Sequence, residues 1–200
     1  MEHYFTSETG TKSEFRDINF LYKDKRFTFI SDNGVFSKNK LDTGSLSLID
    51  AYLEENDSSK EILDLGCGYG TIGIIISKLT GSFVDMVDVN KRSVHLSEMN
   101  IKKNKVCAQA FYSDAYEHVT KKYDVIVTNP PIRAGKEKVL EFLMEASKYL
   151  KENGELWYVI RKDQGAKSIT KTIEEKYIVT NVEKNKGFYI YKAIIRWLLD

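Results

Sequence analysis

Short apolar runs of strand length alternate with amphipathic stretches along most of the chain. We predict strands at about 61–65, 83–88, 107–111, 123–128, 155–160, 177–183 and 188–191. Between them, apolar residues recur at helical spacing, which predicts helices at about 71–79, 91–103, 135–151 and 166–175. This alternation is typical of an α/β fold with a doubly wound parallel sheet and helices on both faces. The last two strands are joined by a short turn at Lys186-Gly187, so they are antiparallel.

A hairpin and a helix are predicted ahead of the first of these strands. Residues 1–26 are polar and irregular in pattern. The β-rich runs 27–30 and 35–36 flank Asn33-Gly34, a dipeptide that favours hairpin turns. The apolar residues that follow are spaced as on an amphipathic helix: Leu46, Leu48, Ile49 and Leu53. We therefore divide the chain into an N-terminal extension at 1–45, with the hairpin as a possible lid, and a domain at 46–200.

The stretch ILDLGCGYGTIG, residues 62–73, predicts a ligand site. An apolar strand that carries Asp64 ends in the alternating glycines Gly66, Gly68 and Gly70, and a helix-compatible run follows. Glycine is needed where the backbone turns sharply and lets a ligand approach. The helix N-terminus adds unpaired N–H groups. We therefore predict a small-molecule site at the carboxyl end of this strand.

The register of these glycines bears on the class of ligand. Gly68-x-Gly70-x-x-Gly73 matches the dinucleotide fingerprint, but the first glycine after the strand is Gly66. In a dinucleotide turn the first glycine of the fingerprint directly follows the strand, whereas here the match begins two residues later, at Gly68. Asp88 ends the next strand, where a carboxylate accepts hydrogen bonds from ribose hydroxyls.

A second motif, Asn129-Pro130-Pro131, contains both prolines of the chain. Two fixed φ angles stiffen this loop, which follows the strand at 123–128 and faces the crevice of the predicted sheet. The Asn129 amide oxygen and a prolyl carbonyl are two acceptors that suit the two hydrogens of an exocyclic amine. Such an amine is a poor nucleophile, so positioning and electrostatics have to carry its reaction. We predict Asn129, Pro130 and Pro131 as the catalytic loop.

Charge is unevenly distributed although the net charge is only +1. Residues 1–120 carry 14 Lys and Arg against 18 Asp and Glu, whereas residues 121–200 carry 16 against 11. A basic C-terminal part is compatible with a polyanionic substrate such as RNA, and equally with a solvated lysine-rich surface. Four basic residues follow the fourth and fifth predicted strands, and we predict that they contact phosphates: Arg133, Lys136, Arg161 and Lys162.

The remaining composition gives no sign of a metal site or a membrane segment. Cys67 and Cys107 have no metal-binding spacing, and we expect Cys107 in the core. The histidines His3, His95 and His118 are scattered. No run of 18 apolar residues occurs, so we expect a cytoplasmic protein without membrane contact.

The two motifs together resemble the amino-methyltransferase branch of the class I S-adenosylmethionine (SAM) methyltransferases. More specifically, the chain is similar to the small methyltransferase domain of the RsmC type, whose members methylate the exocyclic amine of a guanine in small-subunit ribosomal RNA. The similarity covers nearly the whole chain. Its further marks are His3-Tyr4-Phe5, GVFSK at 34–38, Leu41-Asp42-x-Gly44-Ser45, Asp88-Val89-Asn90, IRAGK at 132–136 and Gly187-Phe188-Tyr189.

The resemblance implies a Rossmann-like, seven-stranded sheet with strand order 3-2-1-4-5-7-6 and an antiparallel last strand. It implies SAM as the cofactor and ribosomal RNA or the small ribosomal subunit as the partner, and we expect a monomer. Asp114, after the third strand, is expected to accept a hydrogen bond from the adenine amine. The full set of expected cofactor-binding residues is Asp64, Gly66, Cys67, Gly68, Gly70, Asp88, Val89, Asp114 and Asn129.

Two departures from the family pattern affect substrate recognition. Larger members carry a second, degenerate domain in front, so we expect recognition here from residues 1–45, from the basic C-terminal part or from a partner. Many members have an aromatic residue after Asn-Pro-Pro, where this chain has Ile132. Phe36, Phe188 and Tyr189 are alternative candidates for stacking on a flipped base.

Other functions remain open at this point. Asn-Pro-Pro also serves enzymes that methylate a protein glutamine amide or a DNA adenine amine, although Ile132 and the segment 133–136 favour neither. A non-catalytic ribosome-assembly factor with the same fold is a third possibility, which the intact motif residues disfavour. An NAD(P)-dependent reductase is a fourth, and no catalytic Tyr/Lys pair or His supports it.

Overall fold

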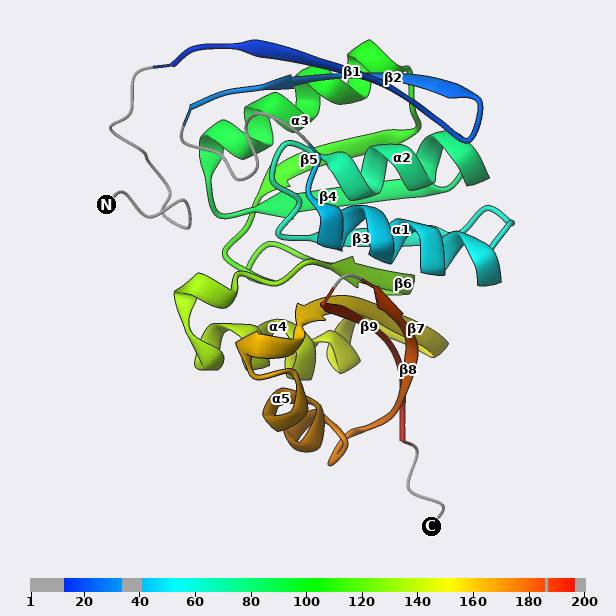
Figure 1. Cartoon of the computed structure of the whole chain (residues 1–200), viewed down its shortest axis with the longest axis vertical. Coiled ribbons are helices and arrows are strands. Elements are labelled where there is room, and N and C mark those ends of the chain that lie inside the picture. The colour runs from blue at the N-terminus through cyan, green and yellow to red at the C-terminus, as the bar shows by residue number, and fades with distance from the viewer. Residues whose placement is uncertain (1–12, 34–40, 186, 197–200) are drawn as a thin grey trace.

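Seven strands form one mixed sheet in the computed structural model, which describes residues 13–33, 41–185 and 187–196 (Figure 1). The strands are β3 (Glu61–Leu65), β4 (Phe83–Asp88), β5 (Ala108–Tyr112), β6 (Tyr123–Thr128), β7 (Leu150–Arg161), β8 (Tyr177–Asn185) and β9 (Phe188–Ile195). Their order is β5-β4-β3-β6-β7-β9-β8, and β9 is antiparallel to both of its neighbours. Counted from β3, this is the predicted order 3-2-1-4-5-7-6, which is confirmed.

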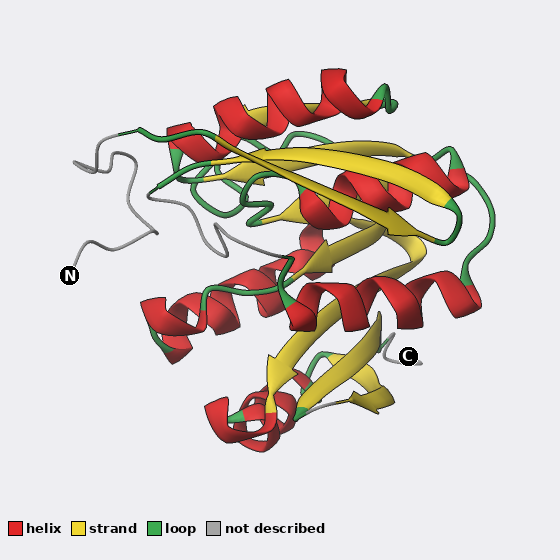
Figure 2. Cartoon of the chain, turned by 45° about the horizontal axis from the view of Figure 1, so that its top comes forward, coloured by secondary structure: helices red, strands yellow, loops and turns green. Residues whose placement is uncertain are grey.

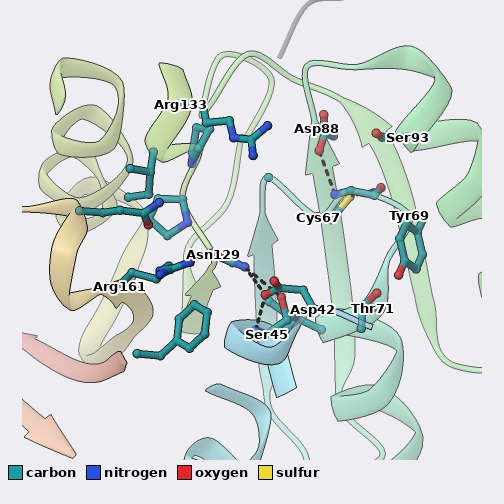
Figure 3. A pocket seen from close by; sticks show the side chains of 18 residues that line it. Asp42, Ser45, Cys67, Tyr69, Thr71, Asp88, Ser93, Asn129, Arg133 and Arg161 are labelled. Carbon is teal, nitrogen blue, oxygen red and sulfur yellow. Dashed lines mark hydrogen bonds between the residues drawn. The ribbon is translucent and has the colours of Figure 1, made fainter. Parts of the chain in front are cut away.

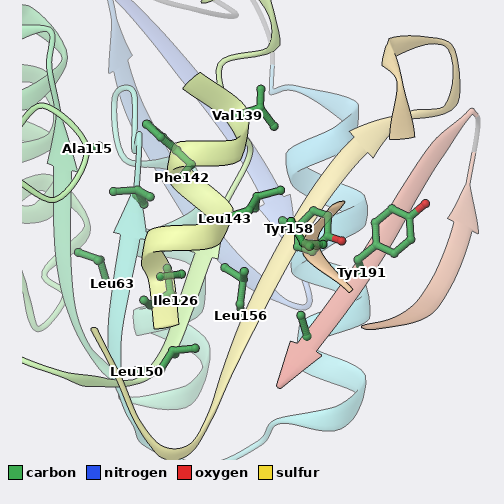
Figure 4. Packing of buried hydrophobic residues seen from close by; sticks show 14 of the residues in the cluster. Leu63, Ala115, Ile126, Val139, Phe142, Leu143, Leu150, Leu156, Tyr158 and Tyr191 are labelled. Atoms are coloured by element: carbon green, nitrogen blue, oxygen red, sulfur yellow. The ribbon is translucent and has the colours of Figure 1, made fainter. Parts of the chain in front are cut away.

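Helices cover both faces of the sheet (Figures 1 and 2). They are α1 (Thr43–Glu55), α2 (Thr71–Thr80), α3 (Lys91–Asn104), α4 (Lys136–Tyr149) and α5 (Ala166–Ile173), with two short 3-10 turns at Ile132–Ala134 and Lys162–Gln164. One apolar core lies between the sheet and α1, α2 and α3, and the other between the sheet and α4 and α5. Figure 4 shows the second core, in which α4 packs on the strands.

Side chains of the central strands alternate between the two cores. Ile62 belongs to the first core and Leu63 to the second, and both are fully buried. Trp157 of β7 is buried in the first core between the second-core residues Leu156 and Tyr158. This burial on both faces explains why these strands are nearly continuous apolar runs in the sequence. Cys107 was wrongly expected in the core: it lies just before β5 and is exposed.

The N-terminal hairpin forms, but from a different pair of strands than the predicted one. β1 (Arg16–Tyr22) pairs with β2 (Lys25–Ser31) across Lys23-Asp24, both of which have positive φ angles. The predicted irregular segment 1–26 therefore contains a strand. Residues 35–36, the expected partner of β2, lie outside the described residues. Alternating aromatic residues explain the register, because Phe20 stacks on Phe27 and Phe29 in the core above the helices.

Two asparagines of α3 fasten this hairpin to the domain. Asn100 accepts from the backbone N–H of Ile30 at 2.7 Å and donates to its carbonyl at 2.9 Å. Asn104, one helical turn later, makes the same pair of bonds with Thr28 at 3.1 and 2.8 Å. The two amides therefore pair the edge of β2 as a neighbouring strand would. Asn100 also donates to the carbonyl of Tyr69, so the hairpin and the glycine turn share one anchor.

In the part of the chain that the structure describes, none of the helices has the length and hydropathy that a membrane span requires.

Replacement of Asn100 by alanine should destabilise the protein by about 2–4 kcal/mol, because one buried and two partly buried backbone groups lose this partner at once. Urea unfolding followed by circular dichroism measures this change. Lys103→Ala is the matched control on the same helix: it removes only an exposed ion pair with Asp17 and should cost no more than about 0.5 kcal/mol. Equal effects of the two variants would contradict the anchoring role of Asn100.

Candidate functional site

The glycine turn between β3 and α2 is built from left-handed backbone. Gly66, Gly68 and Gly70 have φ angles of 73°, 59° and 93°, which residues other than glycine rarely adopt. The N–H groups of Gly66 and Cys67 both donate to the carbonyl of Val87 at 2.9 Å, which ties the turn to the end of β4. A Cβ atom at Gly68 would meet no atom within 4 Å. The turn therefore presents bare backbone to open space.

That open space is a crevice of two adjoining cavities at the carboxyl ends of the strands. Figure 3 shows the first of them. The first has a volume of about 240 Å³ and the second of about 210 Å³. Four residues line both: Gly66, Asp88, Asn129 and Pro131. The first cavity extends toward α1 and β9, and the second toward the loop after β5 and α4. This is where open α/β sheets bind their ligands.

Asp88 is held rigidly at the junction of the cavities. Its Oδ2 accepts from the N–H of Gly68 at 2.9 Å, and its Oδ1 accepts from the N–H of Asn90 at 2.8 Å. Burial raises the pKa of Asp88 to about 6, although the backbone donors, Asn90 first, oppose this shift. At neutral pH its carboxylate is thus a preorganised acceptor beside the glycine turn, suited to hydroxyl donors.

Asp64 lies fully buried under the same turn and does not line either cavity. Its Oδ2 accepts from the N–H of Gly73 at 2.8 Å, whereas its Oδ1 has no hydrogen-bond partner among the described residues. Burial raises the pKa of Asp64 to about 7, the Gly73 N–H lowers it and the charge of Asp88 raises it. A half-satisfied buried carboxylate is costly for folding, so a role other than stability has to explain it.

Asn129 stands on the wall between the two cavities, on the loop after β6. Its amide nitrogen donates to Asp42 Oδ2 and to Ser45 Oγ, each at 3.0 Å (Figure 3). Both amide protons are therefore taken, and the amide oxygen is left for the crevice. The adjoining carbonyl of Pro130 accepts from the N–H of Ile132 at 2.9 Å, which leaves it one further lone pair.

The far side of the first cavity is formed by the Phe188 ring of β9. A Cβ atom at Gly44 would lie 2.8 Å from this ring, so the absence of a side chain there allows the ring to pack on α1. The Arg161 guanidinium carbon lies 5.7 Å from the ring centroid, within the range of a cation–π contact. Tyr189, the next residue, packs in the other core beside Tyr191. Of the two, only Phe188 lines the cavity.

The structure brings together most of the residues predicted from the sequence. Those that line the first cavity are Gly66, Cys67, Gly68, Asp88, Asn129, Pro130, Pro131, Arg133 and Arg161. Val89 and Asp114 line the second, where Asp114 forms an ion pair with Lys138 at 2.6 Å.

Besides Asp64, three predicted residues lie outside both cavity linings. Gly70 caps α2, where a Cβ atom would meet Ile74 at 3.0 Å. Lys136 donates to Ser168 on α5, and Lys162 lies exposed in the 3-10 turn after β7.

Several lining residues were not predicted from the sequence: Tyr69, Thr71, Ser93, Lys138 and Gln164. Asp42 and Ser45, which also line the first cavity, belong to the family pattern but were not predicted as catalytic or cofactor-binding residues. Asp42 carried one local signal, because an aspartate before a helical pattern is a typical N-cap, and its Oδ2 accepts from Ser45 N–H at 2.8 Å. Its second bond, to Asn129, joins positions 87 residues apart and has no local signal. Within the described residues, His, Cys, Asp and Glu form no group of three or more that could hold a metal ion.

A family model described as "Methyltransferase small domain" matches residues 26–192 of the chain. The chain is 43% identical over 197 residues to the uncharacterized protein YbxB of Bacillus subtilis (strain 168), which covers 96% of this chain and 98% of that protein. It is 30% identical over 140 residues to ribosomal RNA small subunit methyltransferase C of Haemophilus ducreyi. That match covers 68% of this chain but only 43% of the relative, so the chain spans less than half of that protein.

Among solved structures, the chain is similar to the T. thermophilus 16S rRNA N2 methyltransferase RsmC in complex with AdoMet and guanosine. The TM-score is 0.82 at 26% identity, over 91% of this chain and 51% of that one. A ribosomal protein L11 methylase from Lactobacillus delbrueckii subsp. bulgaricus superposes with a TM-score of 0.68 at 19% identity, which shows the shared fold alone.

Replacement of Asp64 by asparagine should raise the melting temperature at pH 8, because it removes a buried, half-satisfied charge. The folded pKa of about 7 lies above the ordinary value of 3.8, so wild-type stability falls as pH rises between these values. The advantage of the variant should therefore grow from about pH 4 to pH 7 and then level off.

Thermal unfolding of both proteins from pH 4 to pH 8 measures this difference. Glu152→Gln, which changes an exposed carboxylate, is the control. A melting-point difference that does not change with pH would show that the Asp64 carboxyl is not destabilised in the fold.

Proposed function

The chain belongs to the methyltransferase small domain family, and on that premise we propose that it is a SAM-dependent N-methyltransferase acting on the exocyclic amine of a guanine in small-subunit ribosomal RNA. The observation that carries this proposal is the Asn129 amide, whose nitrogen is fully engaged and whose oxygen is left for the crevice. The names of the RsmC relatives support ribosomal RNA and the guanine N2 amine as the acceptor class.

The residues of the crevice fit SAM. Bare backbone at Gly68 leaves room for a closely approaching ligand, and the Asp88 carboxylate beside it accepts hydrogen bonds from ribose hydroxyls. The second cavity, lined by Val89 and Asp114, suits the adenine ring and its amine. When bound, SAM supplies an electrophilic methyl group, and leaves as a neutral thioether while the methylated amine gives up one proton to solvent. In its ionised form, Asp64 places a negative charge below the turn, which favours a cationic ligand above it.

The acceptor amine is positioned by Asn129 and the proline loop. The Asn129 oxygen and the free lone pair of the Pro130 carbonyl accept one amine hydrogen each, which draws the lone pair of the nitrogen out of the ring. No strong base is required, because the proton becomes acidic only as the new C–N bond forms. Orientation of the amine and preorganised acceptors then account for the rate.

The position of the Phe188 ring is an argument for a planar base as the methyl acceptor. It forms the side of the first cavity beyond Asn129, and Gly44 and Arg161 hold it in place. Stacking on an aromatic ring typically contributes about 1–3 kcal/mol for each base. We propose that Phe188 takes the part that an aromatic residue after Asn-Pro-Pro plays elsewhere, since this chain has Ile132 at that position.

Contacts to the RNA backbone are proposed for basic residues around the crevice. Arg133 and Arg161 line the first cavity, and Lys136 and Lys162 lie exposed next to them in sequence. The N-terminal extension at 1–45 also contributes to the site, since Asp42 lines the cavity. Residues 36–38, which we propose with residues 41–45 as a possible cover of the pocket, lie outside the described residues, and the described hairpin packs on α3.

The function is tested with the purified protein and SAM labelled on its methyl group. Small-subunit ribosomal RNA from cells that lack this protein serves as substrate, both free and assembled into subunits. Digestion to nucleosides and mass analysis should identify N2-methylguanosine. Label found in methyladenine, in methylated protein glutamine or in no product would overturn the proposal.

The Asn129→Ala variant should bind SAM nearly as well as wild type but turn over RNA roughly 10²-fold more slowly or worse. The reason is that it removes one preorganised polar contact to the reacting nitrogen. Calorimetry measures the SAM affinity, and steady-state kinetics the turnover. Asn19→Ala, which changes an exposed amide on the hairpin, is the control and should leave both unchanged. Wild-type turnover of Asn129→Ala would reduce Asn129 to a turn residue.

Phe188→Leu should raise the KM for RNA roughly tenfold and leave SAM affinity unchanged, since it removes a stacking surface and keeps an apolar side chain. Phe188→Tyr, which retains an aromatic ring, should have a KM for RNA close to the wild-type value. The control is Tyr189→Leu, which removes the neighbouring aromatic ring on the other face of β9. If both leucine variants raise the KM alike, general weakening of β9 explains the effect and the stacking role is wrong.

A further inference from the structure

The N-terminus of α1 reaches across the crevice to the loop after β6. Asp42 and Ser45 lie 87 and 84 residues before Asn129 in the chain, and both accept a hydrogen bond from its amide nitrogen. Figure 3 shows the two bonds running from Asn129 to this helix end. An amide nitrogen has two protons, and this contact takes both of them.

The contact fixes which way the Asn129 amide faces. A free asparagine amide rotates and presents nitrogen and oxygen about equally well. Here a carboxylate, which can only accept, faces the nitrogen, so a rotated amide would bring its oxygen against an anion. The oxygen is thereby held on the other side of the amide, toward the crevice.

Asp42 is itself held in place by the helix it caps. Its Oδ2 accepts from the N–H of Ser45 at 2.8 Å and from Asn129 at 3.0 Å, so the same oxygen joins helix and loop. Hydrogen bonds to a charged acceptor are stronger than neutral ones, and linked bonds polarise one another. An anion behind the amide nitrogen therefore makes the amide oxygen a better acceptor.

We propose that Asp42 and Ser45 are positioning residues for methyl transfer, which orient and polarise the Asn129 amide so that its oxygen receives the acceptor amine. This inference rests on the proposed function, in which Asn129 contacts that amine. Asp42 and Ser45 act through Asn129 alone and contact neither the amine nor the methyl group. The N-terminal part of the chain thereby supplies an element of the catalytic apparatus that the two sequence motifs do not contain.

Asp42→Asn tests the proposal with little disturbance of the helix, because asparagine caps helices as well as aspartate does. The new amide can also donate to the Asn129 oxygen, so the orientation is no longer enforced. We expect turnover to fall roughly tenfold with SAM affinity unchanged, and Ser45→Ala to lower it roughly threefold. Asp57→Asn, which removes an exposed carboxylate beyond the other end of α1, is the matched control and should leave turnover at the wild-type value.

A double-mutant cycle separates positioning from a direct role. If Asp42 acts only through Asn129, adding Asp42→Asn to Asn129→Ala should change turnover no further. A further tenfold loss in the double variant would mean that Asp42 contacts the substrate or accepts its proton, and would overturn the proposal. Wild-type turnover in the Asp42→Asn and Ser45→Ala single variants would overturn it as well.

The NMR signal of the Asn129 side-chain amide reports on the orienting contact independently of methyl transfer. In protein labelled with ¹⁵N-asparagine, the side-chain amide signal of Asn129 is identified by its loss in Asn129→Ala. It should exchange slowly with water in wild type and shift and exchange faster in Asp42→Asn, but not in Asp57→Asn. An unchanged signal in Asp42→Asn would refute the orienting contact, whereas a changed signal with no transfer by wild type to any RNA would refute the proposed function only.

Discussion

The site depends on how the chain leaves the central strand β3. Two successive N–H groups, those of Gly66 and Cys67, converge on the single carbonyl of Val87, so the turn is tied to the end of β4. Only left-handed backbone at Gly66 and Gly68 allows this path. The path in turn aims the Gly68 N–H at Asp88. A ligand-binding surface therefore forms from backbone whose geometry is set before any ligand arrives.

The buried carboxylates beside this turn lower the stability of the fold. Asp64 and Asp88 are carboxylates whose pKa burial raises to about 7 and about 6, and one oxygen of Asp64 has no hydrogen-bond partner in the part of the chain that the structure describes. The apolar neighbours of Asp64 in the same strand offset this, since Ile62, Leu63 and Leu65 of β3 are fully buried. A stable sheet thus carries a destabilised carboxylate at its centre. Carboxylates with perturbed pKa values are typical of functional sites.

Three separate parts of the chain meet at the side of the crevice that we propose for the methyl acceptor. The loop after β6 contributes Asn129, the N-terminus of α1 contributes Asp42, and β9 contributes Phe188. Gly44 joins the last two, because the ring packs where a side chain would stand. The family relationship accounts for the fold and for a methyl donor, and this meeting of segments supports a planar, amine-bearing acceptor.

The sequence by itself determined the alternation of strands and helices, which rests on local periodicity, and the glycine turn and the proline loop, which rest on residues with special φ preferences. The strand order was expected from the resemblance to the family. The described hairpin is not the one that the local turn signal Asn33-Gly34 indicated: packing of the Phe27 ring pairs β1 with β2 across Lys23-Asp24, and the expected partner residues 35–36 lie outside the described residues. Only the tertiary structure paired Asp42 with Asn129, since side chains 87 positions apart leave no pattern in the sequence, and their contact is decided by how α1 packs against the sheet.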